Sequence, residues 1–375
     1  MEVSPKLFFD ILLSHDIDFF TGVPDSLLKE FCLCIDNNLI NQNHIIAANE
    51  GSAISIAAGY HLSTGKIPLV YMQNSGLGNA VNPLLSLCDK EVYSIPIITM
   101  IGWRGHPDIK DEPQHAKQGK IQLKLLEALE IPYIVIEDDS NIKNKISNII
   151  DSTKTESKPH AILVKKGTFS KFELEKNNIE ISKQNRERAL EIILDTINDD
   201  DILVSTTGKT SREIFEIREK RNQDHNQDFL TVGSMGHCSS IALGIALQKP
   251  HRKVICIDGD GALIMHMGNI STISSIKPKN FYHILLNNKV HDSVGGQETA
   301  AMKVDLSSIV NSSGYRKTIK NKNLKILHKD LNNFFNLKGP SLIEIDIDLG
   351  SRRDLGRPNI GPIKNKENFM NFIED

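Results

Sequence analysis

The sequence predicts an α/β protein with two domains, each built on a doubly wound parallel sheet. Short apolar runs alternate with helical patterns in both halves, which is typical of parallel sheets covered on both faces. The chain has 375 residues, a length that suits two domains. A polar stretch with few core residues divides the halves. We expect a first domain over 1–170, a linker over 171–182 and a second domain over 183–375.

The first half contains six apolar, β-rich runs, each followed or preceded by a helical pattern. The predicted strands are 19–21, 44–47, 68–72, 96–101, 132–136 and 160–164. The predicted helices are 26–37, 50–63, 78–87, 118–129 and 140–152. Regular alternation of this kind predicts a parallel sheet.

The second half repeats the alternation, so the two halves follow one architectural plan. The predicted strands are 202–205, 229–232, 254–258, 281–286 and 342–347. The predicted helices are 186–197, 211–219, 239–247, one starting at Ala262, and an exposed helix at the C-terminus.

Composition indicates an ordinary globular protein, with 39% hydrophobic and 24% charged residues. The net charge of −3 gives no electrostatic reason to expect nucleic acid or an anionic membrane as partner. No apolar stretch reaches about 18 residues, and the N-terminus lacks a basic-then-apolar leader. We therefore expect a cytoplasmic protein without a nucleic-acid or membrane partner.

The cysteine pattern does not predict a metal site. The chain has five cysteines, an odd number, and none forms a CxxC pair. We expect buried free thiols in a reducing compartment and no zinc site.

Two polar clusters, Gly259-Asp260-Gly261 and Asn287-Asn288, each follow an apolar strand. Neighbouring parallel strands would bring both clusters to the carboxyl edge of one sheet, where ligands bind in open α/β folds. A carboxylate, an amide oxygen and a backbone carbonyl suit Mg²⁺. Flanking glycines let a diphosphate approach the helix that starts at Ala262. The simpler alternative is that Asp260 only caps that helix.

Glu50 follows a predicted strand and opens a helix of small residues, which can pack closely in a core or against a second subunit. Alone, an acidic residue in a first helical turn only offsets the helix dipole. The combination of Glu50 with the two polar clusters of the second half indicates a functional role for this carboxylate.

These motifs together resemble the thiamine diphosphate enzymes, which pair a pyrimidine-binding domain with a diphosphate-binding domain. The resemblance implies that Glu50 acts on the aminopyrimidine, so that the C2 proton of the cofactor can be removed. It implies that the Gly233 carbonyl accepts a hydrogen bond from that ring. Met235 would wedge the cofactor into a bent shape, although a lone Met is commonly core filler.

The resemblance also supplies a ligand set for the diphosphate and the metal. Asp260, Gly261, Ala262 and Asn288 would bind the cofactor. Asp260, Asn288 and the Val290 carbonyl would bind Mg²⁺. The chain departs from many relatives here, because Lys289-Val290 replaces small residues.

The segment Thr207-Gly-Lys-Thr210 superficially suggests a nucleotide-binding P-loop. The full pattern needs a glycine five residues before Gly208, and that residue is Leu203. By resemblance, the Gly208 N–H and the Thr210 hydroxyl contact the diphosphate instead.

The short two-domain plan is similar to the phosphonopyruvate decarboxylases and the sulfopyruvate decarboxylases, whereas many larger relatives insert a third domain for which this chain has no room. The segments that resemble the former are 21–25, 73–79, 101–105, 111–119 and 291–297. Trp103 and 111–119 favour the phosphonate enzymes. The implied reaction converts 3-phosphonopyruvate to phosphonoacetaldehyde and CO₂, in phosphonate biosynthesis. Sulfopyruvate decarboxylation, carboligation and a non-catalytic cofactor-binding scaffold are the alternatives.

A region rich in hydrogen-bond donors provides the candidates for holding the substrate phosphonate, namely Arg104, Lys117 and Gln118. Arginine can bind two phosphonate oxygens at once, although Arg104 could equally form an ion pair.

Asp25 and His115 are the candidates for proton transfer, since related decarboxylases place such residues over the thiazolium. Asp25 could instead cap a helix. We expect the His115 pKa to lie near working pH. The roles of His106, His237 and His291 stay open. The resemblance further implies a homo-oligomer, in which Glu50 of one subunit meets the diphosphate site of another.

Overall fold

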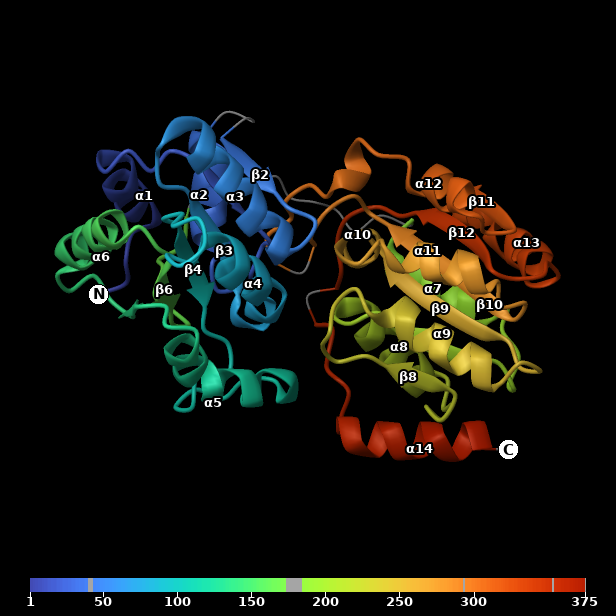
Figure 1. Cartoon of the computed structure of the whole chain (residues 1–375). Coiled ribbons are helices and arrows are strands. Elements are labelled where there is room, and N and C mark those ends of the chain that lie inside the picture. Colours follow the sequence, from blue (N-terminus) through green and yellow to red (C-terminus); the bar gives the residue numbers. More distant parts are fainter. Residues whose placement is uncertain (40–42, 173–183, 293, 353, 375) are drawn as a thin grey trace. The chain divides into compact units, whose positions relative to one another are not determined.

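The computed structural model describes residues 1–39, 43–172, 184–292, 294–352 and 354–374. The chain divides into two compact units (Figure 1). One comprises Met1–Lys176 with Val294–Gln297, and the other comprises Asn177–Ser293 with Glu298–Asp375. The predicted linker, 171–182, lies outside the described residues except for its first two positions.

The first unit contains a six-stranded sheet in which every pair of neighbours is parallel. Its order is β2(His44–Ile46), β1(Phe20–Gly22), β3(Leu69–Gln73), β4(Ile98–Gly102), β6(His160–Val164) and β5(Tyr133–Ile136). The predicted strands are therefore confirmed as a parallel sheet. The strand order reverses next to β1, and ligands of doubly wound sheets bind at such a switch point.

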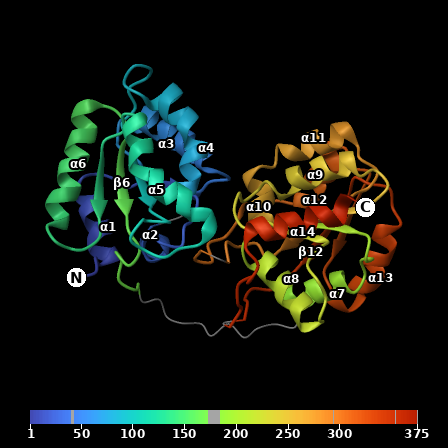
Figure 2. The same ribbon diagram turned by 90° about the horizontal axis from the view of Figure 1, so that it is seen from below.

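Helices cover both faces of this sheet (Figure 2). One face packs against α1(Pro5–Ser14), α2(Lys29–Asn38) and α6(Ile142–Glu156). The other packs against α3(Glu50–Thr64), α4(Leu77–Pro83) and α5(Pro113–Ala128). Successive residues of β3 alternate between the two cores, with Tyr71 on the first side and Val70 on the second. Successive side chains of a strand point to opposite faces of the sheet, so this alternation shows that β3 is buried on both faces.

The second unit repeats the same topology. Its sheet runs in the order β8(Asp228–Leu230), β7(Ile202–Ser205), β9(Val254–Gly259), β10(Phe281–Asn287), β12(Ser341–Asp346) and β11(Lys317–Asn321), and its neighbouring pairs are all parallel. Counted within each unit, both sheets have the order 2-1-3-4-6-5. The two halves are thus two copies of one plan, as the sequence predicts.

Helices also cover both faces of the second sheet. One core includes α7(Arg186–Leu194), α8(Lys209–Lys220) and α13(Leu324–Phe335). The opposite core includes α9(Cys238–Gln248), α10(Asp260–Met265), α11(Asn269–Ile276), α12(Leu306–Ser313) and α14(Pro362–Glu374). None of the described helices is long and apolar enough to pass through a membrane. The five cysteines are buried free thiols, as predicted.

The prediction of an exposed C-terminal helix is wrong in part. Phe369 of α14 is buried in the core of the second unit. The Asn365 side chain accepts a hydrogen bond from Leu230 N and donates one to the Asp228 carbonyl, so α14 pairs with the backbone of edge strand β8. The helix covers an edge that would otherwise present unpaired backbone groups.

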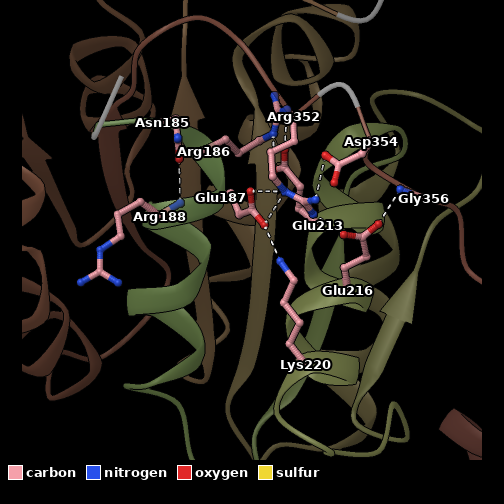
Figure 3. Close-up of polar contacts among 10 residues, drawn as sticks. All are labelled: Asn185, Arg186, Glu187, Arg188, Glu213, Glu216, Lys220, Arg352, Asp354 and Gly356. Atoms are coloured by element: carbon pink, nitrogen blue, oxygen red, sulfur yellow. Dashed lines mark hydrogen bonds and ion pairs between the residues drawn. The ribbon is translucent and has the colours of Figure 1, made fainter. Parts of the chain in front are cut away.

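The segment that leads from β12 to α14 is tied to α7 and α8 by Arg352 (Figure 3). Its guanidinium pairs with Glu187 at 2.8 Å and also with Glu216. Lys220 of α8 reaches the same Glu187 carboxylate at 3.2 Å. The network fixes the course of the chain before α14.

A buried ion pair gives the first prediction. Arg218 of α8 binds both carboxylate oxygens of Asp228, at 2.9 and 3.1 Å, and both side chains are buried. Asp228→Ala leaves a buried, uncompensated guanidinium and should lower the free energy of unfolding by about 3–5 kcal/mol. Urea denaturation of the full chain measures the change.

The matched control is Asp195→Ala, which removes an Arg–Asp pair at 2.8 Å to Arg221 whose Asp195 side chain is 54% exposed. Exposed pairs contribute about 0–1 kcal/mol, so this variant should unfold nearly as wild type. If both variants lost the same free energy of unfolding, the larger contribution of the Arg218–Asp228 pair could not be attributed to its burial.

Candidate active site

Glu50 is held at the carboxyl edge of the first sheet, just beyond β2. Asn49 caps α3 by accepting a hydrogen bond from Ser52 N at 2.9 Å, which starts the helix at Glu50. The Glu50 side chain is only 4% exposed, and its Oε2 accepts a hydrogen bond from Asn79 Nδ2 at 2.8 Å. Within the described residues, no Lys, Arg or His forms an ion pair with it. Among the described residues, Glu50 is therefore a buried carboxylate without a charged partner.

Asp25 follows β1 on the same edge and is fully buried. Its Oδ1 accepts a hydrogen bond from Gln73 Nε2 at 2.6 Å, and its Oδ2 accepts one from Leu27 N at 3.0 Å. Burial raises the pKa of this carboxyl, although Gln73, the Leu27 N–H and the nearby Arg104 charge act in the opposite direction. The alternative of a cap for α2 does not apply, because Leu28 occupies that position.

Arg104 follows β4 and is already paired. Its Nε lies 2.7 Å from Asp111 Oδ2, Nη2 also contacts the Asp111 carboxylate, and Nη1 donates to Ser26 Oγ at 2.9 Å. Asp111 accepts further hydrogen bonds from Gly105 N and Glu112 N, both at 2.8 Å. The structure thus shows the ion pair that was the alternative to substrate binding. A substrate oxygen would have to share or displace these partners.

His115 lies in the first turn of α5 and is buried. Burial, followed by the Arg104 charge, lowers its pKa to about 4, and Asp111 opposes this shift. The expectation of a pKa near working pH is therefore wrong for the free chain, in which the imidazole is neutral at pH 7. The Nδ1 atom has no hydrogen-bond partner within the described residues, so it can bind a ligand atom.

The other two predicted substrate residues lie on the same helix. Lys117 is exposed and Gln118 is half-buried. The described contacts include no ion pair of the Lys117 ammonium. Neither side chain is fixed by the structure as firmly as Arg104.

Asp260 is the first residue of α10, directly after β9, and is 3% exposed. Its Oδ2 accepts a hydrogen bond from the Thr299 hydroxyl. Burial raises the pKa of the carboxyl to about 6, while Thr299 and the backbone N–H groups of Asp260, Gly261 and Asn288 favour the charged form. The Asn288 backbone therefore lies beside the carboxylate, and the structure brings the two predicted clusters together.

The turn after β10 is fixed by its own hydrogen bonds. Asn288 Oδ1 accepts from Val290 N at 3.2 Å, and the Lys289 carbonyl accepts from Thr299 N at 2.8 Å. Lys289 takes a left-handed conformation with φ of 64°. The buried Asn287 side chain donates to Glu344 Oε1 at 2.8 Å, which anchors the turn to β12. Val290, the third predicted metal ligand, is thus part of a defined turn.

The residues predicted to contact the diphosphate lie at the ends of β7 and β9. Gly208 precedes α8 with φ of 94°, a conformation that glycine adopts readily, and Thr210 is buried in the first turn. Ala262 is buried in α10. A Cβ on Gly261 would lie 3.0 Å from His291 Cε1, so the glycine lets this imidazole approach. Burial lowers the pKa of His291 to about 4, which makes it neutral.

Gly233 and Met235 follow β8 and are half-buried. Gly236 has φ of 86°, and a Cβ there would lie 2.6 Å from His266 Cδ2. The His266 ring packs against His237, with centroids 4.1 Å apart. His237 is therefore explained by this ring contact, whereas His106 packs on Trp103 at 4.5 Å.

These residues fit a cofactor with a metal-bound diphosphate. Asp260 and Asn288 offer a buried carboxylate and an amide oxygen, the hard ligands that Mg²⁺ prefers. Gly208 precedes α8 and Gly261 lies in the first turn of α10, and backbone N–H groups at a helix start attract phosphate oxygens. The Glu50 partner Asn79 and the Asp260 partner Thr299 were missed as site residues. Of these two residues, only Asn79 could have been found from the sequence, because it is the last residue of the segment 73–79 that resembles the phosphonopyruvate decarboxylases.

Comparisons with known proteins agree with this geometry. The model of the thiamine pyrophosphate enzyme N-terminal TPP binding domain matches residues 4–126, and that of the C-terminal TPP binding domain matches residues 206–345. The chain therefore belongs to the thiamine pyrophosphate enzymes.

Curated relatives narrow the family further. The phosphonopyruvate decarboxylase of Streptomyces viridochromogenes is 33% identical over 94% of this chain and 90% of its own length. That of Streptomyces hygroscopicus is 32% identical with the same coverage. The sulfopyruvate decarboxylase of Methanosarcina acetivorans is 28% identical over 97% of this chain and 95% of its own length. Within the thiamine pyrophosphate enzymes, the chain belongs to the family that contains phosphonopyruvate decarboxylase.

The packing of Glu50 gives the second prediction. A Cβ on Gly76 would lie 2.1 Å from Glu50 Oε1 and within 2.5 Å of two further side-chain atoms, so Gly76→Ala must displace the carboxylate. We expect kcat/KM to fall at least about 10²-fold, since a shift of about 1 Å in a reacting group can cost that much. Steady-state kinetics and circular dichroism measure rate and fold.

Gly78→Ala is the control, because nothing lies within 4 Å of a Cβ at that position. It should retain wild-type activity. Equal activity of Gly76→Ala would show that the position of Glu50 is not needed for turnover.

Proposed function

We propose that this chain decarboxylates 3-phosphonopyruvate to phosphonoacetaldehyde and CO₂, with thiamine diphosphate and Mg²⁺ as cofactors. The observation that carries the proposal is the full-length similarity to phosphonopyruvate decarboxylases, with a buried Glu50 in one domain and a buried Asp260 in the other. The reaction would belong to phosphonate biosynthesis. A cytoplasmic location fits the five free thiols.

When bound, the cofactor supplies the electron sink that takes up the electron pair left by the departing CO₂. Glu50 would accept a hydrogen bond from the aminopyrimidine. Its low exposure strengthens this interaction, because the local dielectric is low and no side-chain cation within the described residues competes for the carboxylate. Asn79 orients the carboxylate through its hydrogen bond to Oε2.

Asp25 and His115 would handle protons above the reacting carbon. The environment raises the pKa of Asp25 and lowers that of His115, so the two groups are pushed toward each other's range. Burial favours the protonated form of Asp25 relative to a carboxyl in water, and the neutral imidazole of His115 can accept a proton. Gln73 fixes Asp25 for this role.

Arg104, Lys117 and Gln118 would bind the phosphonate group. Arg104 is half-buried and keeps its charge through Asp111, and the ion pair also holds its guanidinium in one orientation. Lys117 adds an exposed positive charge on α5. Positive groups at this end of the substrate leave the carboxylate free to lose its charge as CO₂.

Sulfopyruvate decarboxylation is the second candidate, supported by the 28% identical relative that covers 97% of this chain. Phosphonate and sulfonate differ in charge but share three oxygens around a tetrahedral centre, so the same donors suit both. A non-catalytic scaffold is disfavoured by the buried, ordered Glu50 and Asp260.

Comparison of substrates tests the function. With thiamine diphosphate and Mg²⁺ added, we expect CO₂ release from phosphonopyruvate at a kcat/KM at least about tenfold above that for sulfopyruvate or pyruvate. Glu50→Ala serves as the inactive control and should still bind the cofactor. Sulfopyruvate as the best substrate would move the assignment to the second candidate, and tight cofactor binding without any CO₂ release would indicate a scaffold.

The Asp260 pKa of about 6 predicts a pH dependence of metal binding. A carboxylate binds Mg²⁺ only when deprotonated, and below pH 6 the protonated form dominates in the free chain. The apparent Mg²⁺ affinity in the presence of thiamine diphosphate should therefore fall about tenfold between pH 7 and pH 5. Isothermal titration calorimetry at these pH values measures it.

The variant Asp260→Asn tests how much of the pH dependence of Mg²⁺ affinity is due to titration of Asp260. The variant should bind Mg²⁺ weakly at every pH and lose most of the slope. Wild-type affinity in this variant would remove Asp260 from the metal site.

We further propose a homo-oligomer in which Glu50 of one subunit meets the diphosphate site of another, as the family resemblance implies. Glu50→Ala and Asp260→Ala should each be inactive. After unfolding and refolding together, random dimers would include hybrids with one intact site, and about a quarter of wild-type activity should return. A mixture that stays inactive, although gel filtration shows hybrids, would contradict shared sites.

A further inference from the structure

Three metal-ligating side chains meet in the core of the second unit, outside the site described above. Cys256 and Asp258 belong to β9, and His283 belongs to β10. All three are 0% exposed. The spacing of these residues along the chain gave no sign of the cluster, because strand pairing brings them together.

The two strands place the side chains on one face of the sheet. Cys256 and Asp258 are two residues apart on β9, so they point to the same side. His283 is the direct neighbour of Cys256 in the parallel register of β9 and β10. The three ligand atoms all lie within 4.8 Å of one another, with His283 Nε2 3.6 Å from Asp258 Oδ2.

Two atoms that face this centre have no hydrogen-bond partner within the described residues, namely Asp258 Oδ2 and His283 Nε2. Most buried polar atoms in folded proteins have a partner. The other ends of both side chains are engaged, since Asp258 Oδ1 accepts from Gly259 N at 2.9 Å and His283 Nδ1 lies 3.3 Å from the Tyr315 hydroxyl. The unpartnered atoms are therefore aimed at the centre by groups behind them.

We propose that Cys256, Asp258 and His283 bind a Zn²⁺ ion, with Cys238 as the fourth ligand. The Cys238 Sγ lies 3.4 Å from Cys256 Sγ and would turn from the Val204 carbonyl that it now contacts at 3.4 Å. Zinc–sulfur bonds of about 2.3 Å in a tetrahedron place two sulfurs about 3.8 Å apart, close to the observed spacing.

Ligand type favours this metal. Zn²⁺ would also offset two of the three negative charges that the Cys256 and Cys238 thiolates and the Asp258 carboxylate bring into the core. Sulfur and imidazole ligands select zinc, whereas the oxygen ligands Asp260 and Asn288 select magnesium. The Tyr315 hydroxyl beside His283 Nδ1 is the kind of outer partner that orients a ligating imidazole.

The place of the ion in the fold indicates a structural role. Asp258 and Gly259 are the last residues of β9, and Asp260 begins the next helix. A closed four-ligand site there would fix the end of the strand that carries the proposed magnesium ligand. The ion would be taken up during folding, because all four side chains are buried.

Metal analysis of the full-length chain tests the proposal. After growth with added zinc and dialysis against Mg²⁺, we expect about one zinc per chain in wild type by mass spectrometry. Cys256→Ser and His283→Gln should each lower this content at least tenfold. Matched controls are Cys88→Ser and His160→Gln, which alter a buried cysteine and a buried strand histidine of the first unit and should keep the zinc.

Cobalt substitution gives a readout that does not depend on variant folding. The wild-type chain loaded with Co²⁺ should show sulfur-to-cobalt charge-transfer absorption and the intense d–d bands of a tetrahedral site. Asp260→Ala should keep these bands while losing Mg²⁺-dependent cofactor binding, which separates the zinc site from the proposed function. Wild-type protein without zinc and without these bands would overturn the proposal and leave a His283–Asp258 ion pair.

Discussion

A carboxylate buried without a side-chain cation is the constraint on which the account of this protein depends. Glu50 and Asp260 are 4% and 3% exposed, and within the described residues neither forms an ion pair. Burial of a charge is unfavourable unless hydrogen bonds or a partner compensate it. Asn79 supplies one side-chain hydrogen bond to Glu50, and Thr299 with three backbone N–H groups compensates Asp260, but neither carboxylate has a cation to balance its charge within the described residues. This is the electrostatic setting that a cofactor with a protonatable ring and a metal-bound diphosphate would complete.

The repeated strand order places different residues at equivalent positions of the two units. Both units arrange their strands as 2-1-3-4-6-5, so equivalent strands end in equivalent places. The first unit places Asp25 after β1 and Arg104 after β4, whereas the second unit places Gly208 after β7 and Asn288 after β10. Under the proposed function, this edge would carry the proton-transfer and substrate-binding side chains in one unit and the phosphate- and metal-binding groups in the other. The two units would then differ in chemistry through the residues that follow their strands.

Most of the architecture is predictable from sequence because strands buried on both faces read as continuous apolar runs. Strand β11 was missed, since the exposed edge strand Lys317–Asn321 has no such run. The candidate carboxylates could be named from their position after strands and from family resemblance. The identity of Asp111 as the Arg104 partner and the lowered His115 pKa could not, because they depend on how one loop folds and how deeply it is buried. The convergence of Cys256 with His283 could not either, because it depends on the pairing of two strands.

Exchange of the C2 proton of bound thiamine diphosphate into D₂O, followed by rapid-quench NMR, tests the central role of the buried Glu50 most directly. With cofactor and Mg²⁺ saturating, the account predicts fast exchange in the wild-type chain and a rate lower by about 10²–10⁴-fold in Glu50→Gln, which keeps the size of the side chain but removes its charge. Exchange at the wild-type rate in this variant would contradict the account, because the carboxylate would then have no part in activating the cofactor.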